Sequence, residues 1–521
     1  MSADLADLDR AIACGMAVAW HAARRPDTLA LATAYGDRSF AELNGRANQL
    51  ARWLARHGVG EGAAIAIVTK NRPEFVEAYC AAMRAGIRVT PVNWHLTGAE
   101  TGYIIDNCEA QAVIYDASLG TAEAAAEHAG NCRLRLAVGG SIAGFQSYVE
   151  AIAGERAVDL EKPVRGTQML YTSGTTGRPK GVYRRQLPNQ RSTAQAVAAG
   201  DPDHDRCLCT GPAYHAAPLA FNVVAPLNAG VGVVMVDRWD PEETLRLIET
   251  YRITRTHMVA TMFHRLLQLP EEVRTRYDLS SLELVMHGAA PCPVHVKRAI
   301  IDWFGPIVYE YYAATEGGNN FGIDSETWLK KPGSVGRTPT PENTRILDDA
   351  GGDVRQGEVG TIYFRAPEVG RFEYFKSPEK TDSSYRGDWF TLGDMGYLDE
   401  DGYLFLTGRS AETIISGGVN IYPQEVDAVL LQHGDVLDVC TVGVPNEEWG
   451  EEVKSVVQLN PGVEASPELA DELREFSRAR LPGFKCPRSV DFVDDLPRLP
   501  SGKIQRRLVR DPYWKGRDRQ I

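Results

Sequence analysis

Hydrophobic residues recur every three or four positions in the first third of the chain, and short apolar runs separate these stretches. The clearest helical stretch begins at the capping box Ser39-Phe-Ala-Glu42 and ends near Gly58. Its apolar face carries Phe40, Leu43, Ala47, Leu50, Ala51 and Leu54. A second helix is expected to begin near Pro73, and strands are expected at residues 64–68, 88–92 and 112–115. Helices that alternate with apolar strands predict an α/β fold whose parallel sheet is covered by helices.

The pattern changes after about Gly333, where strands and turns replace the alternation. Strands are expected at residues 360–365, 395–398 and 403–407. Beyond Arg409 the expected elements are a helix at 422–433, strands at 436–444 and 453–459, a helix at 467–480 and a strand at 489–493. We therefore predict a large N-terminal domain (1–409) with several subdomains, one of them β-rich, and a small α+β C-terminal domain (410–521).

Residues 11–23 form an apolar stretch that predicts a single amphipathic helix. It differs from a signal peptide, because Asp4, Asp7 and Asp9 precede it where a signal peptide carries positive charge. No window of the sequence approaches the roughly 18 uncharged apolar residues that a membrane span needs, and the last residues match no lipidation signal. We expect a cytoplasmic protein with no integral membrane contact.

Composition and net charge indicate which kinds of molecule the protein can bind. The chain has 521 residues, of which 44% are hydrophobic and 24% charged, as in soluble proteins of more than one domain. Sixty-nine acidic and 56 basic side chains give a net charge of −13, so no basic field exists to hold a nucleic acid. Small ligands are favoured, and an anionic ligand needs a local basic site.

The cysteines indicate a reducing environment. Nine are scattered over the chain, which is an odd number and unlike a disulfide framework. Cys207 and Cys209 lie close together, but no second thiol pair or histidine cluster completes a zinc site, so we expect core thiols.

The candidate chemistry centres on a polar, glycine-rich string, Tyr171-Thr-Ser-Gly-Thr-Thr-Gly-Arg-Pro-Lys-Gly181. Its glycines let backbone N–H groups approach an anion, its hydroxyls donate hydrogen bonds and Lys180 adds positive charge, so the string fits a polyphosphate loop. It is not a Walker A loop, because Gly181 and Val182 follow the lysine where that motif has Ser or Thr. A generic string of this kind is also compatible with an exposed turn.

The string resembles the phosphate loop of the adenylate-forming superfamily, which includes acyl-CoA synthetases, peptide-synthetase adenylation domains and beetle luciferases. Other motifs follow in the superfamily's order: Tyr312-Ala-Ala-Thr-Glu316, Thr391-Leu-Gly-Asp394 with Arg409, Gly417-Gly-Val-Asn-Ile-Tyr-Pro-Gln-Glu425 and Pro500-Ser-Gly-Lys503. The resemblance spans residues 39–507 and is greatest to bacterial fatty-acyl or sterol-type acyl-CoA synthetases. It implies a C-terminal domain that rotates about a hinge after Arg409.

The resemblance implies a reaction in two halves. A carboxylate attacks the α-phosphate of ATP to give acyl-AMP and pyrophosphate, and the thiol of CoA then displaces AMP. Lys503 is the implied catalytic cation, Glu316 the Mg²⁺ ligand and Thr315 the partner of a phosphate oxygen. Without the motifs, a lysine near a C-terminus and a Thr-Glu pair are more often ordinary exposed residues.

The resemblance also implies the nucleotide-binding residues. Asp394 and Arg409 are assigned to the ribose, and Tyr312 offers a flat face to adenine. The other residues implied to bind ATP are Thr172, Ser173, Gly174, Thr175, Thr176, Gly177, Lys180, Gly288, Ala289, Ala290 and Tyr311. Taken alone, Asp394 is equally compatible with a turn and Tyr312 with a core position.

The acyl site is implied by Pro212-Ala-Tyr-His215, which resembles an aromatic-histidine motif near the substrate carboxylate. Tyr214, His215 and Gly317 are therefore expected to bind substrate, although His215 is equally compatible with the core. Nearby small or apolar residues are Ala213, Ala216, Ala217, Leu219 and Phe221. They predict room for a bulky or long hydrophobic acid, which is fatty, ring-bearing or sterol-derived.

The resemblance places CoA near Gly417 and Gly418, which let a pantetheine arm pass close to the backbone. Lys485 is expected either near CoA or in solvent. Two positions depart from the superfamily: Ala411 replaces a charged hinge residue, and Ala313 replaces a glycine at the pocket floor. We retain the hinge, because Ala411 can still absorb a change in φ and ψ.

We therefore expect an ATP-dependent acyl-CoA synthetase that uses Mg²⁺ and CoA and acts on a small-molecule carboxylate. A homodimer is compatible with the resemblance. The alternatives are an enzyme that loads a carrier protein, a luciferase-like oxygenase and a non-catalytic nucleotide-binding relative. No carrier domain is expected after Lys503, and the presence of Lys503, Glu316, Asp394 and Arg409 argues against a non-catalytic role.

Overall fold

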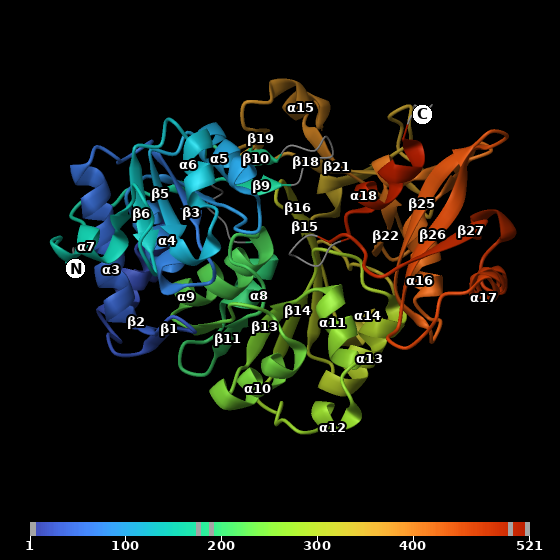
Figure 1. Ribbon diagram of the computed structural model, residues 1–521, viewed down its shortest axis with the longest axis horizontal. Helices are drawn as coiled ribbons and strands as arrows, with labels where there is room; N and C mark the ends of the chain where they lie inside the picture. The colour runs from blue at the N-terminus through green and yellow to red at the C-terminus, as the bar shows by residue number, and fades with distance from the viewer. Residues whose placement is uncertain (1–6, 173–178, 187–191, 499–503, 516–521) are drawn as a thin grey trace.

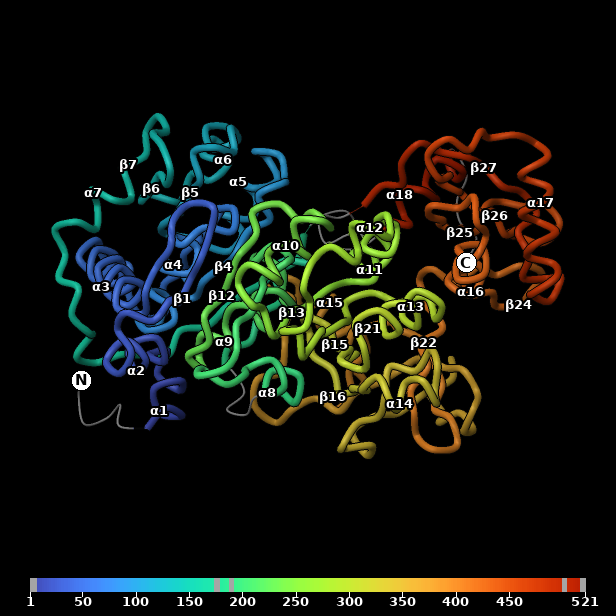
Figure 2. The backbone as a smooth tube through the Cα atoms, turned by 90° about the horizontal axis from the view of Figure 1, so that it is seen from below, coloured from blue at the N-terminus to red at the C-terminus, as the bar shows by residue number. Residues whose placement is uncertain are grey.

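The computed structural model describes residues 7–172, 179–186, 192–498 and 504–515 (Figure 1). These residues form five β-sheets with helices on their faces, so the predicted α/β class is confirmed. Two large sheets and a β-rich subdomain make up the N-terminal domain, and the small C-terminal domain has a sheet of its own. Figure 2 shows the C-terminal domain set to one side of the rest of the molecule.

A six-stranded parallel sheet dominates the first third of the chain, as the hydrophobic pattern predicts. Its order is β7-β6-β5-β3-β4-β8, with β3 (Ala64–Val68) and β5 (Ala112–Asp116) buried along their whole length. The other strands are β4 (Arg88–Pro91), β6 (Leu134–Val138), β7 (Gln146–Ser147) and β8 (Thr167–Gln168). The helices here are α3 (Phe40–Arg56), α4 (Pro73–Arg84), α5 (Gly98–Asn107), α6 (Ala122–His128) and α7 (Tyr148–Ala153). The capping box of Ser39 and Glu42 is present and starts α3.

The eight-stranded sheet occupies the middle of the chain, in the order β16-β15-β14-β13-β11-β12-β1-β2. Its strands are β1 (Leu29–Thr33), β2 (Arg38–Ser39), β11 (Arg206–Cys209), β12 (Gly232–Met235), β13 (Arg255–Met258), β14 (Leu284–His287), β15 (Val308–Ala314) and β16 (Gly317–Asp324). Its helices are α8 (Thr193–Ala199), α9 (Ala225–Ala229), α10 (Pro241–Tyr251), α11 (Ala260–Leu267), α12 (Glu271–Arg274), α13 (Val294–Phe304) and α14 (Ser325–Lys330). Strands β11 to β15 run parallel, so their carboxyl ends share one edge, where α/β proteins commonly bind ligands.

Two antiparallel sheets form the β-rich subdomain. The three-stranded sheet contains β9 (Leu170–Thr172), β10 (Lys180–Tyr183) and β19 (Glu373–Tyr374). The five-stranded sheet contains β17 (Thr344–Leu347), β18 (Gly360–Arg365), β20 (Tyr385–Arg386), β21 (Trp389–Leu398) and β22 (Leu404–Arg409), and α15 (Pro378–Ser383) lies beside it. Strand β21 begins well before the predicted residue 395. Gly393, at φ +76°, and Asp394 follow its first residues and interrupt the apolar pattern that would reveal the strand.

The C-terminal domain has the elements that the sequence predicts. Its strands are β23 (Ile414–Ser416), β24 (Val419–Ile421), β25 (Val436–Asn446), β26 (Gly450–Leu459) and β27 (Ser489–Val493). Its helices are α16 (Pro423–Leu430), α17 (Pro467–Arg478) and α18 (Arg506–Arg510). A separate hydrophobic core that includes Ile414, Val426, Val457 and Leu473 stabilises this domain.

The predicted single helix over residues 11–23 is wrong. The chain forms α1 (Leu8–Ala13) and α2 (Ala17–Ala22), separated by Gly15 at φ +72°. A Cβ atom at Gly15 would lie 2.1 Å from the carbonyl oxygen of Met83, so only glycine allows α1 to approach α4 this closely. The apolar run continues through the break and therefore does not reveal it.

The nine cysteines are all described, and all are free, as expected for core thiols. Seven are buried, and Cys14 and Cys292 are partly exposed. Burial raises the pKa of the Cys80 and Cys108 thiols to about 11, which keeps them protonated.

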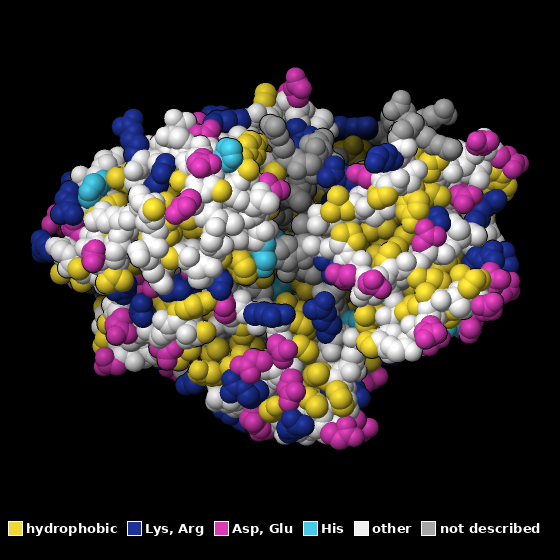
Figure 3. Space-filling model, in the orientation of Figure 1, with side chains coloured by type: hydrophobic (Ala, Val, Ile, Leu, Met, Phe, Trp, Pro, Cys, Tyr) yellow, Lys and Arg dark blue, Asp and Glu magenta, His cyan; other side chains and the backbone are white. Residues whose placement is uncertain are grey.

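Two surface features bear on the kinds of partner. In the part of the chain that the structure covers, none of the helices is both long enough and apolar enough to cross a bilayer. On the face shown in Figure 3, Lys and Arg side chains are interspersed with Asp and Glu.

Candidate active site

A cavity of about 1880 Å³ runs through the N-terminal domain. Its walls come from the β9–β10 hairpin, the β15–β16 hairpin, the π-helix Pro218–Val224, α4 and the N-terminal helices α1 and α2. Among the described residues, six Lys or Arg and three Asp or Glu side chains line it: Arg165, Lys180, Arg184, Arg365, Lys380 and Arg409, with Asp9, Glu316 and Glu368. The cavity is thus locally basic in a chain of net charge −13, as an anionic ligand requires.

The glycine-rich string connects two strands of a β-hairpin. Lys180 on β10 pairs with Thr172 on β9, and both residues line the cavity. The residues between them that we expect to bind ATP, Ser173, Gly174, Thr175, Thr176 and Gly177, lie outside the described residues. Partial burial and the nearby Lys380 lower the pKa of Lys180, so two cations converge beside the hairpin.

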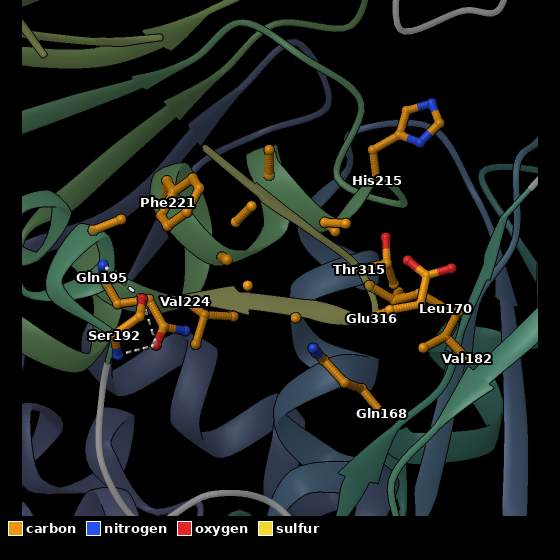
Figure 4. A pocket seen from close by; sticks show the side chains of 18 of the residues that line it. Gln168, Leu170, Val182, Ser192, Gln195, His215, Phe221, Val224, Thr315 and Glu316 are labelled. Atoms are coloured by element: carbon orange, nitrogen blue, oxygen red, sulfur yellow. Dashed lines mark hydrogen bonds between the residues drawn. The ribbon is translucent and has the colours of Figure 1, made fainter. Parts of the chain in front are cut away.

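Thr315 and Glu316 form the tip of the β15–β16 hairpin and project into the cavity. Ala314 pairs with Gly317, which leaves only these two residues in the turn. Figure 4 shows their side chains next to each other at one side of the pocket. The Tyr374 hydroxyl donates a hydrogen bond of 2.9 Å to Glu316 Oε1 and thereby orients the carboxylate. Gly317 also lines the cavity, at φ +135°.

Arg184 holds this turn, and the sequence analysis did not identify it. It follows β10, and its guanidinium donates hydrogen bonds of 3.2 Å to the Thr315 carbonyl and a shorter one to the Glu316 carbonyl. Strand alternation puts Lys180, Val182 and Arg184 on one face, and all three line the cavity. This alternation was the sequence signal from which the position of Arg184 could have been predicted. Tyr374, by contrast, reaches Glu316 from β19, and no local sequence pattern indicates that contact.

Asp394 and Arg409 lie opposite each other on β21 and β22. Arg409 Nε donates to Asp394 Oδ1 at 3.0 Å, and the Tyr312 hydroxyl donates to Asp394 Oδ2 at 2.7 Å. Each carboxylate oxygen keeps a lone pair, so Asp394 can still accept hydrogen bonds from a diol. Tyr312 and Arg409 line the cavity, whereas Asp394 lies directly behind them.

The loop after β14 packs closely against the tyrosines of β15. A Cβ atom at Gly288 would lie 2.6 Å from the Tyr311 ring, so glycine is required there. Ala289 adopts φ +67°, a strained conformation for alanine, and lines the cavity together with Tyr311. The Tyr311 hydroxyl lies 3.0 Å from His257 Nε2, which fixes its position. Gly288 and Ala290 do not contribute to the cavity wall as described.

Tyr214 and His215 line the cavity near Thr315 and Glu316. Burial and the neighbouring His95 lower the pKa of His215 to about 4, so its imidazole is neutral at pH 7. His215 Nε2 is buried and has no hydrogen-bond partner among the described atoms, which leaves it available to a ligand. Asn71 holds the loop before these residues through hydrogen bonds to Gly211 O and from Ala213 N.

Three of the expected C-terminal residues, Gly417, Gly418 and Lys485, lie apart from the cavity. Lys503 is outside the described residues, but its flanking residues Arg498 and Ile504 form an antiparallel bridge, and Arg498 lies near Arg265 of α11. Gly417 and Gly418 form the two-residue turn between β23 and β24, at φ +57° and +79°. Lys485 forms an ion pair of 2.5 Å with Glu425 at the start of α16. None of the last three lines the cavity.

A large α/β domain followed by a small α+β domain is the architecture of the adenylate-forming class of enzymes. The family model described as AMP-binding enzyme matches residues 18–372, and the model described as AMP-binding enzyme C-terminal domain matches residues 425–503. The chain therefore belongs to the AMP-binding enzyme family, whose acid–thiol ligases form AMP.

Named relatives of similar length include CoA ligases. The chain is 35% identical to the 2-succinylbenzoate–CoA ligase of Geobacillus kaustophilus, over 93% of this chain and 95% of the relative. It is 30% identical to the medium/long-chain-fatty-acid–CoA ligase FadD8 of Mycobacterium tuberculosis, over 92% and 86%. Among solved structures, ATP-bound MatB from Rhodopseudomonas palustris matches with a TM-score of 0.80 and 30% identity, over 94% and 96%. The fold also matches the anthranilate CoA ligase AuaEII with anthranoyl-AMP (TM-score 0.84, 23% identity, 96% and 97%).

Proposed function

We propose that the enzyme activates a long or bulky hydrophobic carboxylic acid with ATP and transfers the acyl group to CoA. The observation that carries this proposal is the two-part lining of one cavity. Lys180, Arg184 and Lys380 line it beside Glu316, and small or apolar residues around Phe221 and Val224 line it on the opposite side. A polyphosphate and a hydrophobic acid can therefore meet at the Thr315–Glu316 turn.

In the first half-reaction a carboxylate oxygen attacks the α-phosphorus of ATP and pyrophosphate leaves. Two anions must approach each other, so positioning and charge compensation dominate the barrier. We assign the phosphates to Thr172, Lys180 and the residues of the loop between them. Arg184 supports this arrangement by fixing the backbone of the Thr315–Glu316 turn.

The Thr315–Glu316 turn fits a Mg²⁺ ion that is held mainly by phosphate oxygens. Mg²⁺ prefers one or two carboxylates together with phosphates and water, and supplies charge compensation on the phosphates. Glu316 offers the oxygen that Tyr374 does not occupy, and the Thr315 hydroxyl can bind a phosphate oxygen.

His215 is suited to orient the attacking carboxylate. Because the imidazole is neutral and its Nε2 lacks a partner, an Nε2–H tautomer can donate a hydrogen bond to a carboxylate oxygen. No proton has to be removed, since a carboxylic acid is already ionised at pH 7. We assign Lys503 to the same carboxylate and the α-phosphate, and Asp394, Arg409, Tyr312 and the loop at 288–290 to the nucleoside.

A surface of the C-terminal domain is suited to bind CoA, which supports CoA as the thiol substrate. Trp449 lies against the Gly417 turn, with a hydrogen bond of 2.8 Å from Gly417 N to Trp449 O. Arg488 stacks over the Trp449 ring at 4.0 Å, and Phe484 is 50% exposed. Exposed aromatic rings with arginine and lysine nearby suit the adenine and phosphates of CoA. We propose a boundary between residues 409 and 410, where β22 ends, and a rotation there that carries this surface to the cavity.

The experiment supplies ATP, Mg²⁺ and CoA with short, medium, long, aryl and ring-bearing acids, and measures acyl-AMP and acyl-CoA separately by mass spectrometry. We expect acyl-CoA, with the highest rates for hydrophobic acids. Lys503→Ala should abolish adenylation and leave ATP binding measurable, whereas the exposed Lys515→Ala should retain full activity. Fastest turnover of acetate or of an amino acid would refute the substrate assignment.

The second candidate is an enzyme that loads a carrier protein. The chain is 29% identical to the fatty acid–[acyl-carrier-protein] ligase ScoC of Streptomyces coeruleorubidus over 96% of both chains. Such an enzyme would share the first half-reaction. Accumulation of acyl-AMP without acyl-CoA in the same experiment would favour this candidate.

A further inference from the structure

Gln168 is a polar residue in the wall of the cavity to which the reaction above assigns no role. It ends the short edge strand β8, where it pairs with Val89 of β4. Gln168, Leu170, Tyr171 and Thr172 all line the cavity, whereas Met169 is fully buried in the core. One extended segment therefore leads from the phosphate hairpin to Gln168. Four residues of extended chain span about 13 Å, so Gln168 lies well away from the phosphates.

The Gln168 amide is held in one orientation. The hydroxyl of Tyr79 on α4 donates a hydrogen bond of 2.9 Å to Gln168 Oε1. Burial raises the pKa of Tyr79, which is 7% exposed, so the hydroxyl keeps its proton and remains a donor. The amide nitrogen Nε2 is thereby directed away from Tyr79. Figure 4 shows the Gln168 side chain reaching from one wall into the open centre of the pocket.

Apolar and polar side chains share the space around this amide. Leu170, Val182, Phe221 and Val224 lie around it in Figure 4, together with Ser192, Gln195, Thr315 and Glu316. Among the described residues, the Gln168 side chain bonds to Tyr79 through Oε1, and Nε2 donates to none of them. An acyl chain that fills the space displaces water from the amide. If the chain is purely hydrocarbon, the N–H groups lose a partner, which costs binding energy. If it carries an oxygen at that position, a hydrogen bond replaces the water.

We propose that Gln168 is a specificity-determining residue that binds an acceptor oxygen on the part of the acyl substrate remote from its carboxylate. The substrate class is then a hydrophobic acid that bears a ketone or hydroxyl group, for example on a distal ring. This inference rests on the proposed function and names the substrate class of the same site. A site built to bind a polar group discriminates against the analogue that lacks it.

A second carboxylate is another source of an acceptor oxygen. Arg165 also lines the cavity, and it lies close enough to Tyr79 to influence that hydroxyl electrostatically. A dicarboxylic acid would pair with this guanidinium, because charge-assisted hydrogen bonds are the stronger ones. The amide of Gln168, fixed by a neutral tyrosine, favours the neutral oxygen instead. The experiment therefore includes both kinds of acid.

The test compares matched acids of equal length: a saturated acid, a series with one ketone at successive positions, and the dicarboxylic acid. Initial rates of pyrophosphate release give kcat/KM for each. We expect the best keto acid to exceed the saturated acid by about 10- to 100-fold in the wild type. Gln168→Leu should reduce this ratio to near one, mainly by raising activity on the saturated acid. Gln168→Glu keeps the acceptor for Tyr79 but cannot donate, and should also lose the preference.

Thr167→Val is the matched control, because Thr167 lies on the same strand but not in the cavity wall. It should leave the ratio unchanged. A wild type with no preference at any ketone position, or a preference that survives Gln168→Leu and Gln168→Glu, would overturn the proposal. So would a preference for the dicarboxylic acid that Arg165→Gln abolishes. Failure to release pyrophosphate with any acid would instead refute the proposed function and this inference with it.

Discussion

Arg184 connects the phosphate hairpin to the turn that carries Thr315 and Glu316. Replacement by methionine leaves two backbone carbonyls without their donors, so the turn is expected to lose its fixed position. Arg184→Met should lower kcat/KM for ATP by about 10- to 100-fold, as for the loss of one or two charged hydrogen bonds. The measurement is the rate of pyrophosphate release as ATP is varied. Arg185→Met, at an exposed neighbour, is the control, and equal rates in both variants would contradict the assignment.

Three histidines, of which His257 and His287 are buried and His215 is partly buried, make stability depend on pH. Burial lowers the pKa of His215 to about 4, and the pKa of His257 and His287 to about 3, from an ordinary 6.5. The unfolded chain therefore binds more protons than the folded protein below pH 6.5, and stability falls as the pH falls. Between pH 7.5 and pH 5 each histidine should reduce the free energy of unfolding by about 2 kcal/mol.

Urea denaturation at the two pH values measures this effect. His257→Gln removes one titrating group, so the difference between the two midpoints should shrink, even if the variant is less stable overall. His128→Gln, at an exposed position, should leave the difference unchanged. An unchanged pH dependence in His257→Gln would show that other groups cause it.

The break between α1 and α2 shows how one glycine positions an element. Gly15→Ala combines a positive φ with a contact of 2.1 Å to the Met83 carbonyl, and should destabilise the protein by about 2 to 5 kcal/mol. Gly58 also has a positive φ, +81°, but no atom lies within 4 Å of a Cβ there. Gly58→Ala should therefore cost only about 1 kcal/mol. Thermal unfolding of both variants separates the two effects, and equal losses would contradict the close packing of α1 on α4.

Elements with a regular hydrophobic pattern could be predicted from the sequence, and irregular ones could not. The helix α3 and strands β3 and β5 have strong local signals, namely a capping box and continuous apolar runs. The first half of β21 and the kink at Gly15 depend on contacts with distant residues, so the local pattern does not specify them. Strand order is also a property of long-range pairing, as in β12 beside β1.

The candidate site divides in the same way. Motif residues such as Thr315, Glu316 and Lys180 line the cavity as expected. Arg184 could have been found from its alternation with Lys180, whereas Tyr374 and Gln168 were missed because their contacts are with residues far away in the chain. Tyr374 and Glu316, which are in contact, are 58 residues apart in the sequence, and Gln168 and Tyr79 are 89 residues apart. The residues that we propose to bind CoA, Gly417, Gly418 and Lys485, do not line the cavity.

The last prediction concerns the connection between the two domains. The 3-10 turn Ser410–Glu412 joins β22 to β23, and Ala411 is its middle residue. Proline fixes φ and restricts the preceding residue, so Ala411→Pro should hinder rotation while the domains remain folded. We expect pyrophosphate release to persist and acyl-CoA formation to fall at least about tenfold, because the second half-reaction needs the conformational change. Single-turnover assays separate the two steps. Ala411→Gly should retain both, and equal loss of both steps in Ala411→Pro would refute the hinge.

The burial of the cysteines has a practical consequence for observing that motion. Cys14 and Cys292 are the only partly exposed thiols, and burial holds the pKa of Cys440 at about 12 in the C-terminal domain. A cysteine introduced on an exposed helix of each domain would react with maleimide dyes far faster than the native thiols. The natural sequence therefore serves as a nearly silent background for fluorescence energy transfer between the domains during turnover.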